Sequence, residues 1–282
     1  MMMMMVMDLM VTVMVVVSVI VIVIDTCWHM SVLCVEARLM GVTQLHGVVY
    51  IVCHESSTIR RFNATTRQRL TDVDIKGLRS PQDIVSCEQT SRAYVADNVE
   101  CIWRVSSDGA DIKRWRSKSP SDTFKPWALS VTQTRLLVTS LDPHQLIQFN
   151  AVGDERRRVQ LPDDMTPLHA VESPTGTFIV CHGQVSEVNT GGEVLRQFSG
   201  SHLSSLGVTP HVAVDSHGNI FVADRDNRCI LLLEDHLRMC RVIIDKHQLN
   251  YKPRRLCYME QSGQLLVGLD RGGIVVFDML RR

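Results

Sequence analysis

The sequence predicts an all-β protein folded as a six-bladed β-propeller. Its main sign is a repeat in which a polar residue follows a short apolar run every 42 or 43 residues, at His54, Asp97, Ser140, His182 and Asp224. A second series with nearly the same spacing consists of prolines, at Pro81, Pro126, Pro167, Pro210 and Pro253. Two independent series with a period of about 40–45 residues, built from short strands, are typical of propeller blades.

The segments between these landmarks have the composition of strands, because Val, Ile, Phe and Tyr dominate them and short polar turns separate them. In the first three units we expect strands at 42–45, 48–52 and 59–62; at 81–85, 94–97, 101–105 and 112–115; and at 127–131, 136–139 and 146–149. In the last three units we expect them at 168–171, 178–181, 185–188 and 194–198; at 210–215, 220–224, 229–233 and 241–244; and at 255–258, 264–267 and 273–277.

The sixth unit leaves no room for a fourth strand, because the chain ends at Arg282, five residues after its third strand. Upstream of the first unit, the segment 31–37 has a strand-like composition and no unit of its own. We expect this N-terminal strand to complete the last blade, so that a propeller of residues 31–282 closes on itself without a long open edge.

The bulk composition excludes some classes of protein. Thirty basic and thirty acidic residues give a formal net charge of zero, which is not the overall positive charge of a nonspecific nucleic-acid binder. None of the nine cysteines forms a C-x-x-C pair, so a zinc ribbon or RING is not predicted. Most lie in apolar runs, as Cys53, Cys181 and Cys229 do, where cysteine acts as a small apolar residue. We therefore expect reduced, buried thiols in a cytoplasmic protein.

Residues 1–24 form a separate apolar tract of Met, Val and Ile, which we exclude from the fold. The run 9–24 is shorter than the roughly 20 residues of a usual membrane span. It also lacks the basic residues and the small-residue cleavage site of a signal peptide. A low-complexity tract of repetitive coding sequence is the third interpretation. If the tract is a genuine signal or anchor, the protein is secreted or attached to a membrane instead of cytoplasmic.

The fifth unit resembles an NHL repeat in Pro210, Asp215, the run 218–220, the run 222–224, and the pair 227–228. The second unit keeps its proline and the run Tyr-Val-Ala-Asp. Over residues 31–279 the architecture is similar to the propeller of TRIM-NHL proteins, without their RING, B-box or coiled coil. The resemblance implies a surface that binds protein or RNA, and it does not imply ligase activity.

The recurring polar residues have two interpretations. In the first, each aspartate bonds to backbone N–H groups of its own loop and is structural. In the second, the five side chains face the central channel. Calcium-dependent hydrolases of the gluconolactonase and regucalcin type share this architecture, and Ca²⁺ requires several oxygen ligands. Weak candidates for such ligands are Asp83, Glu172 and Asp215, which stand near inner strands.

A basic cluster formed by Lys113, Arg114, Arg116 and Lys118 stands on a predicted outer strand. Charged residues there keep an exposed edge soluble, which is the simpler interpretation. Because Trp115 lies between two of the arginines, the cluster is also a candidate for RNA binding, which combines cations with stacking aromatic rings.

The sequence contains no nucleophile elbow, zinc-protease motif or phosphate-binding loop. We therefore expect a non-catalytic scaffold without a cofactor that binds a macromolecular partner, a protein first of all. The alternatives are a calcium-dependent hydrolase of the same architecture and an RNA-binding propeller.

Overall fold

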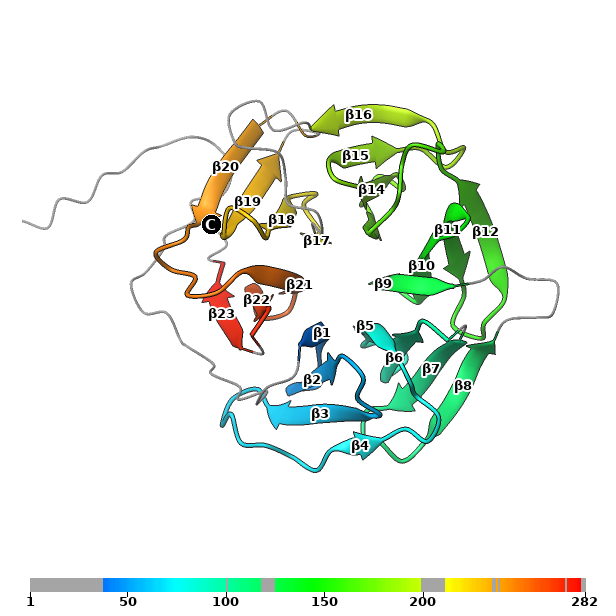
Figure 1. Ribbon diagram of the computed structural model, residues 1–282, viewed down its shortest axis with the longest axis vertical. Coiled ribbons are helices and arrows are strands. Elements are labelled where there is room, and N and C mark those ends of the chain that lie inside the picture. Colours follow the sequence, from blue (N-terminus) through cyan, green and yellow to red (C-terminus); the bar gives the residue numbers. More distant parts are fainter. Residues whose placement is uncertain are drawn as a thin grey trace, which may run out of the picture.

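The computed structural model describes residues 38–279 apart from 100, 118–124, 199–210, 235, 236, 238 and 272. This part of the chain contains 23 strands, which form six sheets. The sheets are arranged radially around a central axis, as the blades of a propeller are (Figure 1). The predicted six-bladed β-propeller is confirmed.

Each of the first three blades is an antiparallel sheet of four strands, which follow one another from the centre outwards. Blade 1 contains β1 (Leu39–Leu45), β2 (Val48–Cys53), β3 (Thr58–Asn63) and β4 (Val73–Asp74). Blade 2 contains β5 (Pro81–Cys87), β6 (Arg92–Asp97), β7 (Cys101–Ser106) and β8 (Ile112–Ser117). Blade 3 contains β9 (Pro126–Thr132), β10 (Arg135–Leu141), β11 (His144–Phe149) and β12 (Glu155–Gln160).

Blades 4 and 5 repeat this order, and blade 6 has three strands within the described residues. Blade 4 contains β13 (His169–Glu172), β14 (Phe178–Cys181), β15 (Val185–Val188) and β16 (Val194–Phe198). Blade 5 contains β17 (His211–Val214), β18 (Ile220–Asp224), β19 (Cys229–Glu234) and β20 (Met239–Ile244). Blade 6 contains β21 (Pro253–Met259), β22 (Gln264–Leu269) and β23 (Ile274–Asp278).

Two outer strands, β4 and β12, lie in segments where the sequence analysis predicted no strand. In β12 only Val159 is buried, and the other five residues are exposed. An outermost strand has one face against its blade and one edge in water, so its side chains need little apolar character. The pattern of apolar residues, which reveals the inner strands, is weak in such strands.

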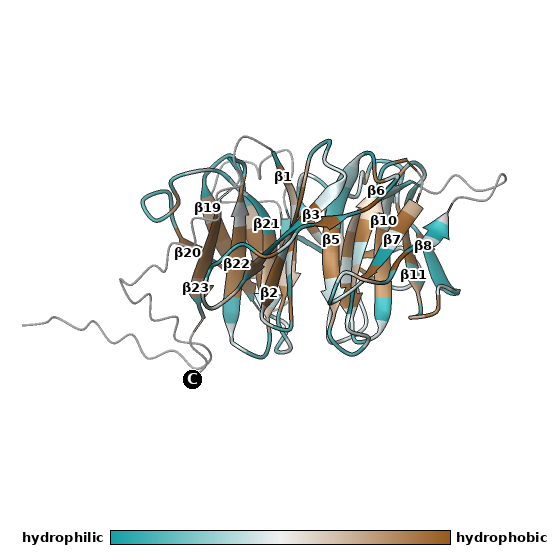
Figure 2. Ribbon diagram, turned by 90° about the horizontal axis from the view of Figure 1, so that it is seen from below, coloured by the Kyte–Doolittle hydropathy of each residue, from teal (hydrophilic) through white to brown (hydrophobic). Residues whose placement is uncertain are grey.

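The hydrophobic core lies between neighbouring blades. Between blades 2 and 3, the Trp115 ring makes edge-to-face contacts with Tyr94 and Phe149, at centroid distances of 5.1 and 5.8 Å. A similar cluster joins blades 1 and 2 around Tyr50 and Trp103. Seen from the side, the strands are largely apolar and the turns at both faces of the disc are largely polar (Figure 2). Burial of this apolar surface provides the main driving force that holds the blades together.

The disc has two faces that differ in their loops. On one face, which we call the inlet face, the chain enters each inner strand, and the second and third strands of each blade are joined there. The turns after β1, β5 and the other inner strands lie on the opposite face. This assignment follows from the antiparallel order of the strands within each blade.

Six residues, one from each blade, occupy the same register on the inner strands, and we call them the channel ring. Their partners on the second strands recur every 42–45 residues, at Val52, Ala96, Thr139, Cys181, Ala223 and Gly268. The ring itself consists of Gly41, Asp83, Ala128, His169, His211 and Arg255. In blades 1, 2, 3 and 6 a β-bulge directly precedes the ring residue.

Closure of blade 6 by residues 31–37 concerns a segment outside the described residues, as does the apolar tract 1–24. In the described part, β23 pairs only with β22. Elsewhere the connection from an outer strand to the next inner strand is long, with six residues at 75–80 and eight at 161–168 and at 245–252. A strand ending at residue 37 would leave only Arg38 before β1. No helix within the described residues is long and apolar enough to cross a membrane.

Candidate functional site

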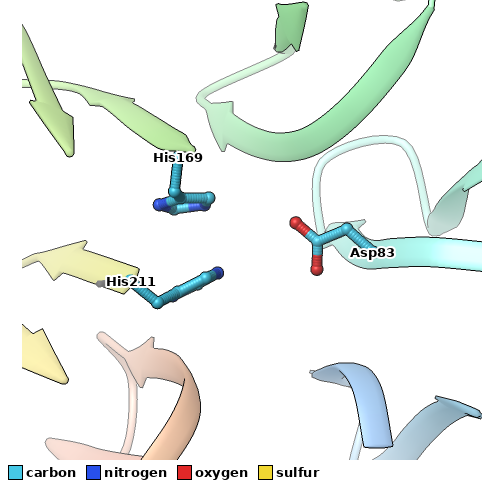
Figure 3. Close-up of side chains that lie close together, drawn as sticks. All are labelled: Asp83, His169 and His211. Atoms are coloured by element: carbon cyan, nitrogen blue, oxygen red, sulfur yellow. The ribbon is translucent and has the colours of Figure 1, made fainter. Parts of the chain in front are cut away.

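Three polar members of the channel ring come together at the centre of the disc. Asp83, His169 and His211 come from blades 2, 4 and 5, and their side chains point into the channel (Figure 3). Their possible ligand atoms all lie within 4.8 Å of one another. The three residues are almost completely buried, with exposures of 2%, 3% and 5%. Groups so far apart in sequence meet because each blade brings its ring position to the same depth.

The carboxylate of Asp83 joins three blades. Its Oδ1 accepts a hydrogen bond from the N–H of Ile84, and its Oδ2 accepts one from the N–H of Leu129 in blade 3, both at 2.9 Å. The Nε atom of Arg255, in blade 6, lies 3.7 Å from Oδ1. Burial raises the pKa of Asp83 to about 6, although Arg255 and the two N–H donors act in the opposite direction.

The two histidines are stacked, with ring centroids 3.6 Å apart and an interplanar angle of 23°. Nδ1 of His169 accepts from the N–H of Val212 at 3.4 Å, and Nδ1 of His211 accepts from the N–H of Leu256 at 3.3 Å. Both Nε2 atoms therefore carry the proton in the neutral rings. Nε2–H of His169 donates to the carbonyl of Leu129 at 3.2 Å. The Nε2 of His211 has no partner among the described residues.

Burial lowers the pKa of both histidines. The pKa of His169 falls to about 3, first because the ring is desolvated and second because of the positive charge of Arg255. That of His211 falls well below its usual range through burial, its neighbour His169 and two arginines, Arg255 and Arg254. Both rings are neutral at physiological pH, so they act as hydrogen-bond donors and acceptors without charge.

A simple rule explains these contacts. The inner strand is the edge of its blade, so some of its backbone N–H groups face the channel without a strand partner. The residue after the ring position donates its N–H to the ring side chain of the preceding blade, as in the pairs Leu129–Asp83, Val212–His169 and Leu256–His211. Each acceptor therefore satisfies a backbone donor and connects two blades.

Gly41 is the member of the channel ring in blade 1, where the backbone of blade 2 approaches closely. A Cβ atom at this position would lie 2.5 Å from the backbone nitrogen of Ile84 and 2.9 Å from Oδ1 of Asp83. Any side chain here would separate blades 1 and 2, because the nearest atoms belong to backbone and to a fixed carboxylate.

The three buried residues are a poor metal site in this geometry. Nearly parallel stacked rings do not direct their nitrogen lone pairs to one point, whereas tetrahedral or octahedral binding requires this. Metal binding through Nε2 would also move the ring proton to Nδ1, where a backbone N–H already points. The arrangement instead provides donors, most clearly the unpartnered Nε2–H of His211.

A cavity of about 140 Å³ extends from the ring along the channel. Asp83, His169 and His211 line it, and further along its wall is apolar, with Val85, Val131, Val171 and Val214 among its residues.

The five recurring polar residues bond locally. Asp97 accepts from the N–H groups of Arg79 and Ser80, in the loop that leads into its blade. Asp224 accepts from the N–H and the side-chain amide of Asn227, in the following turn. The other three members of this recurring series are His54, Ser140 and His182.

Ser140 donates to the carbonyl of Asp142, and Nε2 of His182 lies 2.7 Å from Oγ of Ser186. His54 is exposed in the turn after β2, where its ring lies 3.7 Å from Glu55. No bond joins two members of this series in the described part of the structure. The polar side chains that meet at the centre of the disc belong to the channel ring and not to this recurring series.

Glu172 and Asp215 do not occupy equivalent positions. Glu172 pairs with Phe178, and the matching residue of blade 5 is Val214, which pairs with Ile220. Glu172 accepts from Arg135 at 2.9 Å and from Gln148 at 2.8 Å.

The carboxylate of Asp215 accepts three hydrogen bonds in its own turn, from the N–H groups of His217 and Asn219 and from the Asn219 amide. These interactions already occupy the oxygen atoms that a calcium ion would need. Of the three calcium candidates, only Asp83 reaches the channel ring.

The basic cluster on β8 is partly engaged within the molecule. The guanidinium of Arg114 lies over Trp103 at 5.1 Å, and that of Arg116 lies over Phe149 at 5.4 Å. Lys113 is 3.1 Å from Asp111. Lys118 lies outside the described residues.

His169 and His211 were not among the candidates from the sequence. The available signal was their place directly after the recurring prolines, in Pro167-Leu168-His169 and Pro210-His211. The common register was hidden because the ring residue stands two positions after the proline in blades 2, 3, 4 and 6 but one position after it in blade 5.

No protein-family model matches this chain, and no curated protein matches its sequence. Solved structures do share its fold. A Bacteroides caccae protein of unknown function has a TM-score of 0.62 at 14% identity, over 79% of this chain and 82% of that chain. A catalytically inactive variant of virginiamycin B lyase from Staphylococcus aureus, bound to quinupristin, has a TM-score of 0.63 at 12% identity, over 87% and 96%. A chain of a nidogen–laminin complex has a TM-score of 0.60 at 14% identity, over 78% and 84%.

Likeness at this level of identity shows the fold alone. The chain is a six-bladed β-propeller similar to propellers that serve both a lyase and a protein complex.

Proposed function

We propose that this protein is a non-catalytic propeller that binds a protein partner through its inlet face. The observation that carries the proposal is an exposed aromatic residue held by charged side chains between blades 5 and 6. We call this group the Tyr251 patch, and it consists of Arg225, Asp226, Tyr251, Lys252, Asp270 and Arg271.

The Tyr251 side chain is 43% exposed, and the guanidinium of Arg271 lies 5.4 Å from the centre of its ring. Arg225 lies between two carboxylates, 3.6 Å from Asp226 and 3.9 Å from Asp270. Lys252 is 3.2 Å from Asp226 and bridges to the loop before β21. All of these residues lie in inlet-face loops or at their ends.

Ion pairs so exposed contribute little to folding, roughly 0–1 kcal/mol each. They do hold the side chains in fixed positions before a partner arrives, which lowers the entropy cost of binding. Tyrosine and arginine are the residues that most often dominate the energy of protein interfaces. The composition and order of the patch therefore favour a protein surface as its partner.

The channel supports the non-catalytic part of the proposal. The acceptor atoms of Asp83, His169 and His211 that could remove a proton from a substrate are bonded to backbone N–H groups of neighbouring strands. A catalytic base has a pKa near the working pH and a free acceptor atom. Here the polar groups of the ring serve to join blades.

The hydrogen bonds of blade 5 support an NHL-type repeat as the ancestor of these blades. The repeat landmarks Asp215 and Asp224 each bind the side-chain amide of an asparagine in the next turn, Asn219 and Asn227, at 2.7 Å. These pairs give the landmark residues a structural reason to recur.

A cytoplasmic location is also part of the proposal. Six of the described cysteines form no disulfide, and four of them are buried: these six are Cys87, Cys101, Cys181, Cys229, Cys240 and Cys257. Burial raises the pKa of Cys101 to about 11 and that of Cys229 to about 12, which keeps these thiols protonated and unreactive.

The test is affinity capture from cells of the source organism, with quantitative mass spectrometry. We expect a partner that the double variant Tyr251→Ala/Arg271→Ala captures roughly tenfold less well than the wild type. A control variant on the opposite face, His46→Ala/Ser91→Ala, removes an exposed hydrogen bond of 2.9 Å and should capture the partner normally.

Equal capture by both variants would place the partner elsewhere and overturn the role of the patch. Calcium-dependent lactone hydrolysis by the purified protein would contradict the non-catalytic assignment. RNA recovered in place of protein, with its binding lost on replacement of Lys113 and Arg114, would favour the RNA-binding alternative.

A further inference from the structure

Arg254 is a buried cation without an anionic partner in the described part of the protein. It is the bulge residue of β21, one position before the channel ring. Its side chain is only 5% exposed. Within the described residues, its side chain makes one weak hydrogen bond, from Nη2 to the sulfur of Met40 at 3.5 Å, and its Nε has no partner.

The neighbouring Arg255 has an anionic partner and two carbonyl acceptors at this depth, although its Nε, like that of Arg254, has no hydrogen-bond partner among the described residues. Arg255 faces the Asp83 carboxylate at 3.7 Å and donates to the carbonyls of Gln82 and Arg254, at 3.2 and 3.0 Å. A buried charge is normally paired in this manner, because transfer of an unpaired ion out of water is very unfavourable. Arg254 lacks such a partner, although it occupies the same strand.

The surroundings of Arg254 are also strongly positive. Burial lowers the pKa of the Arg254 guanidinium to about 9, and three nearby guanidiniums act in the same direction, those of Arg255, Arg38 and Arg225. The carboxylate of Asp270 acts in the opposite direction. Asp83 is already shared between Arg255 and two backbone N–H groups. The unpartnered Nε2–H of His211, in the adjacent blade, adds a neutral donor to this side of the channel.

We propose that the inlet-face mouth of the channel binds an oxyanion, a carboxylate or phosphate group, with Arg254 as its main ligand. Arg38 and Arg225 attract the anion, and the Arg254 guanidinium binds it with charge-assisted hydrogen bonds. Such planar donors fit both kinds of oxyanion. The site is independent of the protein partner proposed above, although Arg225 belongs to both surfaces.

The experiment measures thermal unfolding at pH 7.5 in sodium chloride, sodium acetate and sodium phosphate at one ionic strength. A ligand that binds only the folded state raises the unfolding temperature. We expect the wild type to unfold at a higher temperature in acetate or phosphate than in chloride. A response to acetate alone identifies a carboxylate site, and a response to phosphate alone identifies a phosphate site.

Arg254→Met keeps the length of the side chain and removes its charge. This variant should lose the anion response while unfolding in chloride at the same temperature as the wild type or a higher one, because no unpaired charge remains buried. Arg157→Met, on the exposed strand β12, is the matched control and should keep the wild-type response. An equal response in wild type and Arg254→Met, or none in the wild type, would overturn the proposal.

A second measurement covers the case in which Arg254→Met does not fold. Phosphate and acetate are titrated by calorimetry into the wild type and the double variant Arg38→Gln/Arg225→Gln. Removal of the two outer cations should weaken binding of the preferred anion about threefold or more. Unchanged affinity in the double variant contradicts the site.

Discussion

Acidification should destabilise this protein through its two stacked histidines. In the folded state neither ring accepts a proton readily, since burial lowers the pKa of His169 to about 3 and that of His211 well below its usual range. In the unfolded chain both rings have the ordinary value of 6.5. As the pH falls below 6.5, protons bind to the unfolded state and pull the equilibrium towards it.

The magnitude follows from these values. Between pH 7.5 and 5.0, each histidine lowers the free energy of unfolding by about 2 kcal/mol, or ~4 kcal/mol for the pair. Asp83 acts in the opposite direction. Its folded pKa of about 6 is above the ordinary 3.8, so its contribution to stability is complete below 3.8 and is lost as the pH rises through 6. Acidification to pH 5.0 restores about 1.4 kcal/mol, which leaves a net loss of roughly 2.5 kcal/mol.

Urea unfolding at the two pH values measures this difference directly. In the double variant His169→Gln/His211→Gln, only the contribution of Asp83 remains from this group, so the pH dependence should reverse and the protein should be more stable at pH 5.0 by about 1.4 kcal/mol. The control His54→Gln changes an exposed ring and should follow the wild type. If the double variant loses as much stability on acidification as the wild type does, the histidine pair is not the cause.

Two further predictions concern the closure of the ring and of the propeller, and a third concerns the Tyr251 patch. Gly41→Ala should lower the free energy of unfolding by about 1–3 kcal/mol, because its Cβ would meet backbone atoms of blade 2. Gly268→Ala, whose Cβ would meet the flexible end of Leu39, should cost less, and equal losses in urea unfolding would refute this account. Deletion of residues 1–24 should leave the unfolding temperature unchanged, whereas deletion of residues 1–37 should lower it, because we expect the segment 31–37 to pair with β23. If both deletions melt as the full chain does, the N-terminal segment does not close blade 6. Tyr251→Ala alone should weaken capture of the protein partner without a change in unfolding temperature, since the side chain is 43% exposed.

The period of the sequence was enough to predict the blades but not the channel. Inner and second strands are buried on both faces, so their apolar runs recur clearly, as in 94–97 and 220–224. The channel ring depends on register, and a bulge changes register by one residue without a sequence signal of its own. Pro167 stands two residues before His169 but Pro210 only one before His211, so Glu172 and Asp215 have the same distance from their prolines and different positions in their blades.

The predicted position of the closing strand also shows what sequence composition cannot determine. The segment 31–37 has the composition of a strand, but composition says nothing of the length of chain needed to return from the rim to the centre. That length is a property of the disc, and the described connections at 75–80, 161–168 and 245–252 use six to eight residues for it. The predicted closing strand at 31–37 leaves Arg38 alone for this return, so the truncation experiment tests the length of chain and not its composition.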